Sequence, residues 1–310
     1  MKEFIIENEY LKVKLLDYGA RIISLIYKPL NRNLVLGYEN IYDYIKDPNY
    51  FGATVGFNAN RIKDAKFNLE NKTYELDKND GNNNNHSGKF GLDKKIWDAD
   101  IKEDRIEFNI KEKEPFIYKA KVIYELEDKD LKITIQAKGE ETSLFNFTNH
   151  TYFNLEENYE EGIYNHKLKL YSNKITPTDN ELIPTEEILN VDSTIYNFNK
   201  EKLLGEMIEN NLKSFGSNKG YDINYIMEKA SYQKLGEVSV KDLSLSVYSD
   251  SPAFQLYTGN FIKINNEDRP YLGLCIEAQN VPNSINSDKF IKPIYIKDQI
   301  FERNITYSFR

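Results

Sequence analysis

Cysteine is nearly absent from this sequence, and long apolar runs are absent altogether. The single cysteine, Cys275, cannot form a disulfide within the chain. No apolar run approaches the length of a membrane span, and charged residues interrupt the first sixteen positions, where a signal peptide would need an apolar core. These absences predict a cytoplasmic protein without a membrane partner.

Arginine is also scarce, with seven residues against thirty-four lysines, and no basic stripe or block occurs. The 41 Lys and Arg residues face 49 Asp and Glu residues, so the net charge is −8 with both signs interleaved. A nucleic-acid partner is therefore not expected. The sequence also lacks an internal repeat and a Pro/Gly/Ser linker, which favours a single domain over residues 1–310 and predicts a monomer or weak homodimer.

Aromatic residues, in contrast, are abundant, with 23 Tyr and 17 Phe in 310 residues. Aromatic rings suit β-strands, and Tyr combines an apolar body with a polar tip. The composition is therefore typical of strands and of surfaces that contact sugars.

Apolar and polar residues alternate with period two in many short segments, which is the pattern of half-buried strands. Segments 118–126 and 131–137 flank the polar connection 127–130 and predict an antiparallel hairpin. Further strands are expected at 11–15, 67–76 (with a turn near Asn71), 106–110, 168–171, 238–247, 254–258, 272–278 and 305–309. Helical periodicity is weak and strongest at 40–46 and 203–213. The pattern predicts an all-β fold of large antiparallel sheets packed face to face.

Glu277 lies on an expected strand whose two faces differ. Leu272, Leu274 and Ile276 point to one side as core, whereas Glu277 shares the other side with the small residues Gly273 and Cys275. That arrangement leaves room above the sheet. From the pattern alone, Glu277 is either a site residue or a surface carboxylate, and Cys275 is expected to pack.

Segment 144–155 carries a similar signal. If it is extended, one face collects the hydrogen-bonding side chains Asn146, Thr148, His150, Tyr152 and Asn154. Such a face suits either a surface that binds hydroxyl groups or a buried polar network. A lone histidine in this pattern is more often structural than catalytic.

Two further residues stand out as site candidates. His86 precedes Ser87-Gly88 in an expected loop and is either a site residue or exposed, and Arg61 offers a planar fork for paired hydrogen bonds or for a structural ion pair. A metal site of His86, His150, His166 and a carboxylate lacks the usual ligand spacing. The Gly-x-Ser-x-Gly, P-loop and dinucleotide motifs are absent.

Several separated motifs together resemble the galactose mutarotase (aldose 1-epimerase) family, in the family's order and over almost the whole chain. They are Ala59-Asn60-Arg61-Ile62, His86-Ser87-Gly88 with Gly91-Leu92-Asp93-Lys94 and Trp97, Thr148-Asn149-His150-Thr151-Tyr152-Phe153-Asn154-Leu155, Tyr221-Asp222-Ile223-Asn224, Gln255-Leu256-Tyr257-Thr258-Gly259-Asn260 and Leu274-Cys275-Ile276-Glu277-Ala278-Gln279.

The resemblance implies a β-supersandwich with an open cleft across its large sheet and an enzyme that interconverts the α and β anomers of a free hexose such as galactose or glucose. By position, Glu277 looks like the family's general base and His150 like its general acid. No cofactor or metal is implied. The positions that match substrate-binding residues are Asn60, Arg61, His86, Asp222 and Gln255.

The residue types fit the reaction. An ordinary Glu (pKa about 4.3) is ionised at neutral pH and can accept the anomeric hydroxyl proton. An ordinary His (pKa about 6.5) can be cationic and donate a proton to the ring oxygen. The free aldehyde then rotates about its C1–C2 bond and recloses on either face.

The chain departs from the family pattern at several positions that bear on substrate preference and on the rim of the cleft. They are Ser87 in place of Gly, Phe57 and Asn58 after Gly56 in place of an Arg, Ile223 in place of a frequent His, Ala278 and Asn280 after the Glu, and Glu114-Pro115-Phe116-Ile117 where a Gly-Tyr-Pro-Gly turn is expected.

Three alternatives stay open. A relative that acts on a phosphorylated or deoxy sugar is one, although few Arg residues are available for a phosphate. A non-catalytic carbohydrate-binding protein is another, but it would not need both His150 and Glu277. A glycoside hydrolase or lyase is the third, because Glu277 and Asp222 could supply the two carboxylates that a hydrolase needs.

Overall fold

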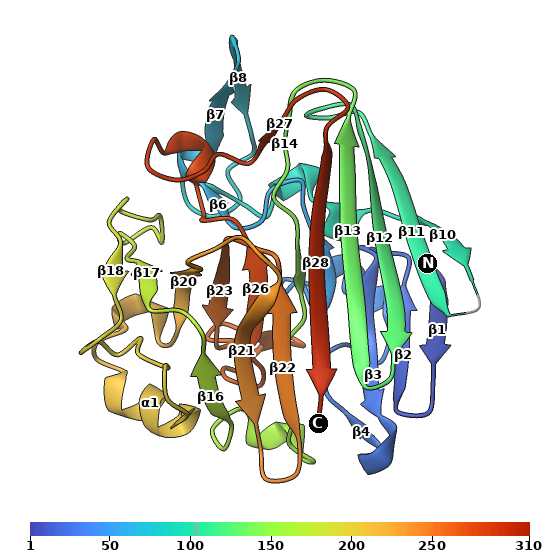
Figure 1. The fold of residues 1–310 in the computed structure, drawn as a ribbon, viewed down its shortest axis with the longest axis vertical. Coiled ribbons are helices and arrows are strands. Elements are labelled where there is room, and N and C mark those ends of the chain that lie inside the picture. The colour runs from blue at the N-terminus through green and yellow to red at the C-terminus, as the bar shows by residue number, and fades with distance from the viewer. Residues whose placement is uncertain (103) are drawn as a thin grey trace.

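The computed structural model describes residues 1–102 and 104–310, and their fold is built almost entirely from strands (Figure 1). The largest sheet has nine antiparallel strands. In spatial order these are β10 (Asp98–Ile101), β11 (Arg105–Glu112), β12 (Tyr118–Glu127), β13 (Asp130–Gly139), β28 (Ile300–Phe309), β22 (Ser244–Ser249), β21 (Gln233–Ser239), β16 (Lys167–Leu170) and β19 (Lys202–Leu203).

Two smaller antiparallel sheets accompany it. The four-stranded sheet contains β1 (Glu3–Glu7), β2 (Leu11–Leu16), β3 (Arg21–Tyr27) and β4 (Arg32–Asn33). The five-stranded sheet contains, in spatial order, β18 (Leu189–Asn190), β17 (Lys174–Thr176), β20 (Asp222–Ile226), β23 (Ala253–Tyr257) and β26 (Cys275–Gln279). The all-β antiparallel prediction is confirmed.

Short ribbons and helical turns complete the described chain. The two-stranded pairs are β5 (Ala53–Val55) with β15 (Thr148–His150), β6 (Arg61–Ile62) with β9 (Asn84–Asn85), β7 (Lys66–Leu69) with β8 (Lys72–Glu75), β14 (Ser143–Leu144) with β27 (Ile294–Tyr295), and β24 (Lys263–Ile264) with β25 (Glu267–Asp268). The helices are α1 (Leu204–Asn211) and the 3₁₀ turns η1 (Lys28–Leu30), η2 (Ile41–Lys46), η3 (Lys63–Ala65), η4 (Gly88–Phe90), η5 (Leu92–Lys94), η6 (Tyr159–Glu161), η7 (Gly216–Asn218) and η8 (Ser284–Asn286).

Alternation along the chain determines which face of each strand is buried. In β12, Tyr118, Ala120, Val122 and Tyr124 are buried and the residues between them are not. The pairing of Glu127 with Asp130 closes the predicted β12–β13 hairpin. The apolar face of this hairpin therefore enters the core, and its charged face remains outside.

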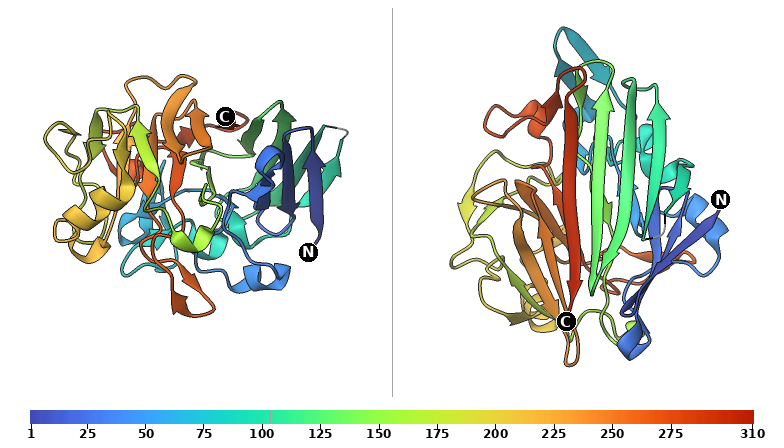
Figure 2. Two further views of the ribbon diagram at one scale, coloured as in Figure 1. Left: turned by 90° about the horizontal axis from the view of Figure 1, so that it is seen from below. Right: turned by 45° about the vertical axis from the view of Figure 1, so that its right-hand side comes forward.

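The nine-stranded sheet packs against both smaller sheets, as Figures 1 and 2 show from three directions. Toward one end of the large sheet, β1 contacts β11 and β12. Toward the other end, Gly236 of β21 faces β26, where an added Cβ would lie 2.9 Å from Ile276 Cδ1. Val13, Val122, Leu256 and other core residues belong to one hydrophobic cluster that joins all three sheets. The prediction of one domain remains a proposal, which this continuity supports.

Two element predictions need correction. Segment 238–247 is not one strand but the end of β21 and the start of β22, because the polar pair Lys241-Asp242 forms a turn closed by the bond from Val240 N to Leu243 O (2.9 Å). The helical periodicity at 40–46 corresponds to the 3₁₀ turn η2, which Asn40 caps by accepting from Tyr42 N. The second predicted helix, within 203–213, is α1.

Candidate active site

Two strands that are far apart in sequence bring His150 and Glu277 together. β15 ends in His150, and Glu277 lies in the middle of β26. An antiparallel bridge joins Phe153 to Leu274, and three residues further along each strand stand His150 and Glu277. The backbone pairing therefore sets the two side chains opposite each other, next to the five-stranded sheet rather than on the nine-stranded sheet where the cleft was expected.

The two side chains meet inside the protein. His150 Nε2 lies 3.6 Å from Glu277 Oε1, and the side chains are only 5% and 3% exposed. On its other side, His150 Nδ1 lies 3.6 Å from the sulfur of the buried Cys275. Glu277 Oε2 forms no hydrogen bond with any described residue. The interpretations of Glu277 as a surface carboxylate and of His86 as an exposed loop residue are both wrong, because both residues are buried.

Burial shifts the pKa of both members of the pair away from its ordinary value. Desolvation lowers the pKa of His150 to about 4. Desolvation, reinforced by the nearby Asp222 carboxylate and opposed by Arg61, raises the pKa of Glu277 to about 8. Burial therefore favours a neutral imidazole at His150 and a protonated carboxyl at Glu277. These shifts run opposite to the ionisation that an anionic Glu277 beside a cationic His150 needs.

His86 completes a cluster of aromatic and imidazole rings. Its ring centroid lies 5.3 Å from that of His150. The N–H of Asn60 donates to His86 Nδ1 over 3.2 Å, so the neutral ring carries its proton on Nε2. Burial, and then the charges of His150, Arg61 and Lys94, hold the pKa of His86 well below its usual value. His86 is thus suited to act as a neutral hydrogen-bond donor.

Arg61, Asp222 and Gln255 form a second polar group beside Glu277. Gln255 lies directly across from Glu277 in the β23–β26 ladder, and its amide donates to Asp222 Oδ1 over 2.5 Å. Arg61 Nη1 lies 3.7 Å from Asp222 Oδ2, while its Nε donates to Asp80 Oδ2 over 2.7 Å. In the part of the chain that the structure describes, Gln255 Oε1 has no hydrogen-bond partner. The structure therefore gathers all seven residues that the sequence nominated for the site.

Tyr50 is a site residue that the sequence analysis missed. Its ring lies 4.7 Å from the ring of His86 and stacks at 5.8 Å from that of His150. Its backbone is left-handed, with φ of 59°, which is unusual for a bulky residue. No motif or alternation in the sequence pointed to Tyr50.

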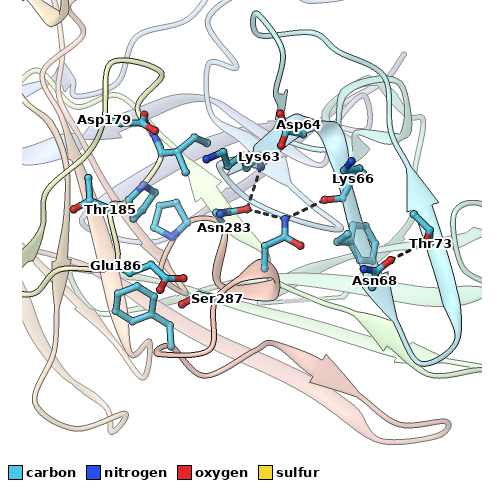
Figure 3. A pocket seen from close by; sticks show the side chains of 16 residues that line it. Lys63, Asp64, Lys66, Asn68, Thr73, Asp179, Thr185, Glu186, Asn283 and Ser287 are labelled. Carbon is cyan, nitrogen blue, oxygen red and sulfur yellow. Dashed lines mark hydrogen bonds between the residues drawn. The ribbon is translucent and has the colours of Figure 1, made fainter.

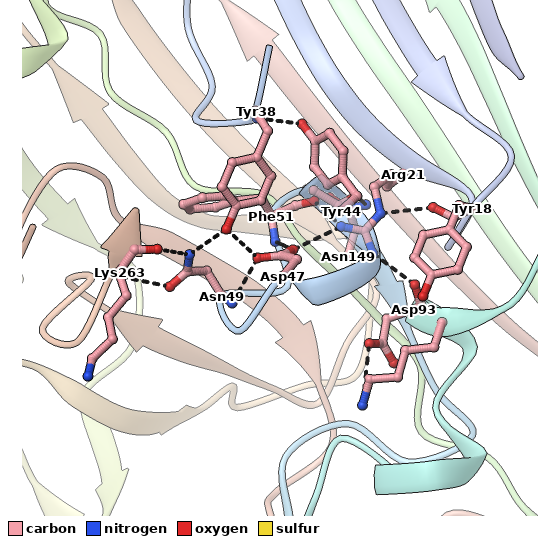
Figure 4. Close-up of polar contacts among 12 residues, drawn as sticks. Tyr18, Arg21, Tyr38, Tyr44, Asp47, Asn49, Phe51, Asp93, Asn149 and Lys263 are labelled. Atoms are coloured by element: carbon pink, nitrogen blue, oxygen red, sulfur yellow. Dashed lines mark hydrogen bonds and ion pairs between the residues drawn. The ribbon is translucent and has the colours of Figure 1, made fainter. Parts of the chain in front are cut away.

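A buried ion pair fixes the loop that carries Tyr50, as Figure 4 shows. Arg21 Nη1 lies 2.9 Å from Asp47 Oδ2, and the two side chains are 1% and 2% exposed. Arg21 donates to Phe51 O over 3.2 Å, and Asp47 accepts from Phe51 N over 2.8 Å. Gly52 N then donates to His150 O over 3.0 Å, so this network also ties the loop to β15.

Most family departures have a local structural explanation. Ser87 is buried with φ of 66°, and its hydroxyl accepts from Asn58 N and donates to Asn58 O. Phe57 packs edge-on against Phe116, which belongs to the segment that replaces the expected turn. Asn280 Oδ1 accepts from the buried Arg303 over 2.9 Å. None of these substitutions alters the His150–Glu277 pair.

The same cluster offers donor atoms that could coordinate a cation. One donor atom each from His86, His150 and Glu277 lies within 4.8 Å of the others. Two imidazoles and a carboxylate are a common donor set for divalent transition metals. Metal removal is therefore the direct test of the prediction that no metal is required.

A separate pocket of about 640 Å³ lies between the β7–β8 hairpin, the 179–186 loop and the segment that contains η8 (Figure 3). Asn283 accepts from Lys63 N on its floor, and its own N–H donates to Arg61 O over 3.0 Å. Phe67 and Phe290 contribute apolar walls. None of the seven nominated residues lines this pocket, so it is distinct from the candidate active site.

Comparison with known proteins identifies the group to which the chain belongs. A sequence model described as aldose 1-epimerase matches residues 2–308. The chain belongs to the aldose 1-epimerase family. This confirms the resemblance inferred from the motifs, and the isomerase activity for which the family is named is the one expected from them.

Relatives of the aldose 1-epimerase family resemble the chain over nearly its full length. Galactose mutarotase from Sus scrofa is 32% identical, with 96% of this chain and 90% of the relative covered. Aldose 1-epimerase from Escherichia coli is 29% identical, with 92% and 88% covered.

Solved structures of the family agree. A galactose 1-epimerase from Lactobacillus acidophilus superposes with a TM-score of 0.87 at 26% identity, covering 99% of this chain and 94% of its own. An aldose epimerase homologue from C. elegans reaches 0.90 at 25% identity, covering 100% and 98%. These confirm the galactose mutarotase-like fold. Among the described residues, no helix is long and apolar enough to span a membrane.

Proposed function

We propose that this member of the aldose 1-epimerase family interconverts the anomers of a free aldohexose such as galactose or glucose, with Glu277 and His150 moving the protons. The observation that carries the proposal is the buried pair itself, with His150 Nε2 3.6 Å from Glu277 Oε1. Two groups that share one proton can take a proton at one atom of the sugar and return one at another.

The proton balance of the reaction requires such a pair. Glu277 as base removes the proton from the anomeric hydroxyl, the bond between C1 and the ring oxygen breaks, and His150 as acid protonates the ring oxygen. Rotation about C1–C2 and the reverse transfers close the ring with either configuration. Burial favours the shared proton on Glu277, so this assignment requires the proton to move to His150 when the sugar binds. A sugar hydroxyl that donates to the unpaired Glu277 Oε2 would favour that move, since hydrogen bonds to a carboxylate lower its pKa.

The surrounding residues suit the recognition of hydroxyl groups. We assign Arg61, Asp222 and Gln255 to the hydroxyls remote from C1, with Asp80 holding the Arg61 fork in place over 2.7 Å. His86, held by the N–H of Asn60, offers its Nε2 proton to the substrate.

Local charge favours an uncharged sugar over a phosphorylated one. Glu277, Asp222 and Asp80 all lie around Arg61, which is engaged with two of these carboxylates. A phosphate would meet more negative than positive charge there. We also propose that the protein is cytoplasmic, has one domain and acts as a monomer or weak homodimer. The proposal includes no nucleic-acid or membrane partner.

Polarimetry on fresh α-galactose and α-glucose tests the function. We expect Glu277→Gln and His150→Asn each to lower kcat by about 10²–10⁴-fold while the protein stays folded. Glu140→Gln, at an exposed carboxylate that pairs with Lys111, is the matched control and should retain full activity. A wild type no faster than buffer on common aldoses would refute the proposal, and loss of activity after EDTA treatment would refute its metal-free chemistry.

A further inference from the structure

Next to the catalytic pair lie two polar side chains to which neither the family resemblance nor the proposed mechanism gives a role. Gln279 is fully buried, and neither its Oε1 nor its Nε2 forms a hydrogen bond within the described protein. Thr148 is also fully buried, and its Oγ1 is likewise without a partner. Buried polar groups are normally paired, and each one left unpaired costs stability.

The strand register places these two residues side by side. Along β26, Gln279 projects from the same face as Glu277, and along β15, Thr148 projects from the same face as His150. β15 contacts β26, and extending the pairing of Phe153 with Leu274 and the approach of His150 to Glu277 by two residues brings Thr148 to the position opposite Gln279. On its other side, Gln279 faces the small residue Ala253 of β23.

The unpaired atoms are concentrated on this one face. In the described chain, fourteen buried side-chain N or O atoms have no partner, and six of them belong to five residues here, namely Thr148, Asn224, Gln255, Glu277 and Gln279. Asn224, Gln255 and Glu277 form one cross-strand row, and Gln279 lies about 7 Å from Glu277 along the strand. The set includes both donors and acceptors, as a ligand with several hydroxyl groups requires.

We propose that Gln279 and Thr148 together bind one hydroxyl group of the sugar, on the side of Glu277 away from Asp222, and thereby determine which aldoses the enzyme accepts. This inference rests on the proposed function. A hydroxyl can donate to Gln279 Oε1 or accept from its Nε2 and form a second hydrogen bond with Thr148 Oγ1.

The test combines two isosteric variants with sugars that lack single hydroxyls. Gln279→Met and Thr148→Val keep the shape but remove the hydrogen-bonding groups. The mutarotation rates of galactose and of its 2-, 3-, 4- and 6-deoxy analogues are measured with wild type and both variants. Gln136→Met serves as the matched control, because Gln136 lies on the nine-stranded sheet and bonds Glu302.

We expect Gln279→Met to lower kcat/KM for galactose by roughly tenfold and Thr148→Val by a smaller factor, since each removes one partner of a buried hydrogen bond. For one deoxy analogue, wild type should lose a similar factor and Gln279→Met should cause no further loss. That analogue identifies the hydroxyl. Thermal unfolding should show the variants as stable as wild type or more so, because they remove unpaired polar atoms.

Two results would overturn the inference while leaving the proposed function intact. One is an active Gln279→Met enzyme with unchanged kcat/KM on galactose, and the other is an equal loss on galactose and on every deoxy analogue. If wild type itself accelerates no mutarotation, the proposed function fails separately. In that case, calorimetry compares the affinity of wild type and Gln279→Met for galactose. Weaker binding by Gln279→Met would support the inference, and equal affinities would refute it.

Discussion

Two buried polar regions lie close to His150, and they use their hydrogen bonds differently. Around the Arg21–Asp47 ion pair, the guanidinium donates to Tyr18 O, Phe51 O and Asp93 O, and the carboxylate accepts from the backbone of Asn49 and Phe51. Around Glu277, in contrast, six polar atoms of the sheet face have no partner among the described residues. Both regions are polar and buried, but every side-chain nitrogen and oxygen of the Arg21–Asp47 pair is bonded, and only Asp93 Oδ1 beside that pair lacks a described partner.

That difference separates a supporting network from a binding surface. A fully paired buried network holds the backbone in one arrangement, and here it fixes the loop that carries Tyr50 against the two histidines. Unpaired polar groups on a buried face destabilise the folded protein, and a ligand that forms hydrogen bonds with them offsets this cost when it binds. Changes in the first region should therefore lower stability, whereas changes in the second should lower activity and leave stability equal or higher.

The largest effect is expected from breaking the ion pair. Asp47→Ala leaves the Arg21 charge buried without its partner, which typically costs about 3–5 kcal/mol of unfolding free energy. Urea unfolding measures the loss. The control is Glu140→Ala, because the exposed Lys111–Glu140 pair should contribute no more than about 1 kcal/mol. Equal losses in both variants would remove the distinction between the two regions.

At Glu277, a substitution is expected to raise the free energy of unfolding rather than lower it. Its pKa is raised to about 8 in the folded protein, so the folded state binds the proton more tightly than the unfolded chain does. Stability is therefore lost as pH rises from about 4.5 to about 8. Gln never ionises, so Glu277→Gln should be more stable than wild type above pH 8, by on the order of 1–4 kcal/mol, with the advantage disappearing below pH 4.5.

Thermal unfolding of wild type and Glu277→Gln at pH 5 and pH 9 checks this prediction. A gap that is the same at both pH values would mean that Glu277 is not held protonated by burial. A variant less stable than wild type at pH 9 would mean that the carboxylate supports the fold, as Asp47 does.

The pH profile of kcat/KM sharpens the comparison further. The pair holds one proton between about pH 4 and about pH 8, and both base and acid are present only in that window. We expect a plateau that falls about tenfold per unit above pH 8 and below pH 4. With ordinary pKa values, the upper limb would instead begin near 6.5. Mutarotation assays in buffers of constant ionic strength measure the pH at which kcat/KM begins to fall.

Much of the fold and of the site followed from local pattern. Period-two alternation placed Glu277 and His150 on polar faces of their strands and predicted the β12–β13 hairpin correctly, because alternation alone determines side-chain direction. The family motifs then nominated residues that the fold brings together. The prediction of one strand over 238–247 was wrong because the apolar residues shift from even positions (Val238, Val240) to odd positions (Leu243, Leu245, Val247), and that shift marks the turn.

Other features depend on contacts that no local pattern encodes. The Arg21–Asp47 pair joins residues 26 positions apart, and Tyr50 reaches the histidines through a left-handed backbone. The reversed ionisation of His150 and Glu277 arises from burial by the assembled sheets. Gln279 stood in a recognised motif, but its unpaired amide became visible only once its neighbours were known.

The smallest expected effect concerns Tyr50, where the two regions meet. Its ring packs on His86 and His150, while its neighbour Phe51 is held by Arg21 and Asp47. Tyr50→Phe keeps the ring and should stay within about twofold of wild-type kcat. Tyr50→Ala removes the ring and should lower kcat by roughly threefold to tenfold, since His150 loses one wall and an imperfectly placed catalytic group is slower.

The split between kcat and stability decides which region Tyr50 serves. If its ring positions His150, kcat falls in Tyr50→Ala, Tyr50→Phe restores it, and urea unfolding changes little because the Arg21–Asp47 bonds to Phe51 remain. If instead Tyr50→Ala unfolds as easily as Asp47→Ala, Tyr50 belongs to the supporting network. An unchanged kcat in Tyr50→Ala would show that the backbone of the loop, fixed by the ion pair and by the bond from Gly52 N to His150 O, is sufficient to hold the imidazole in place.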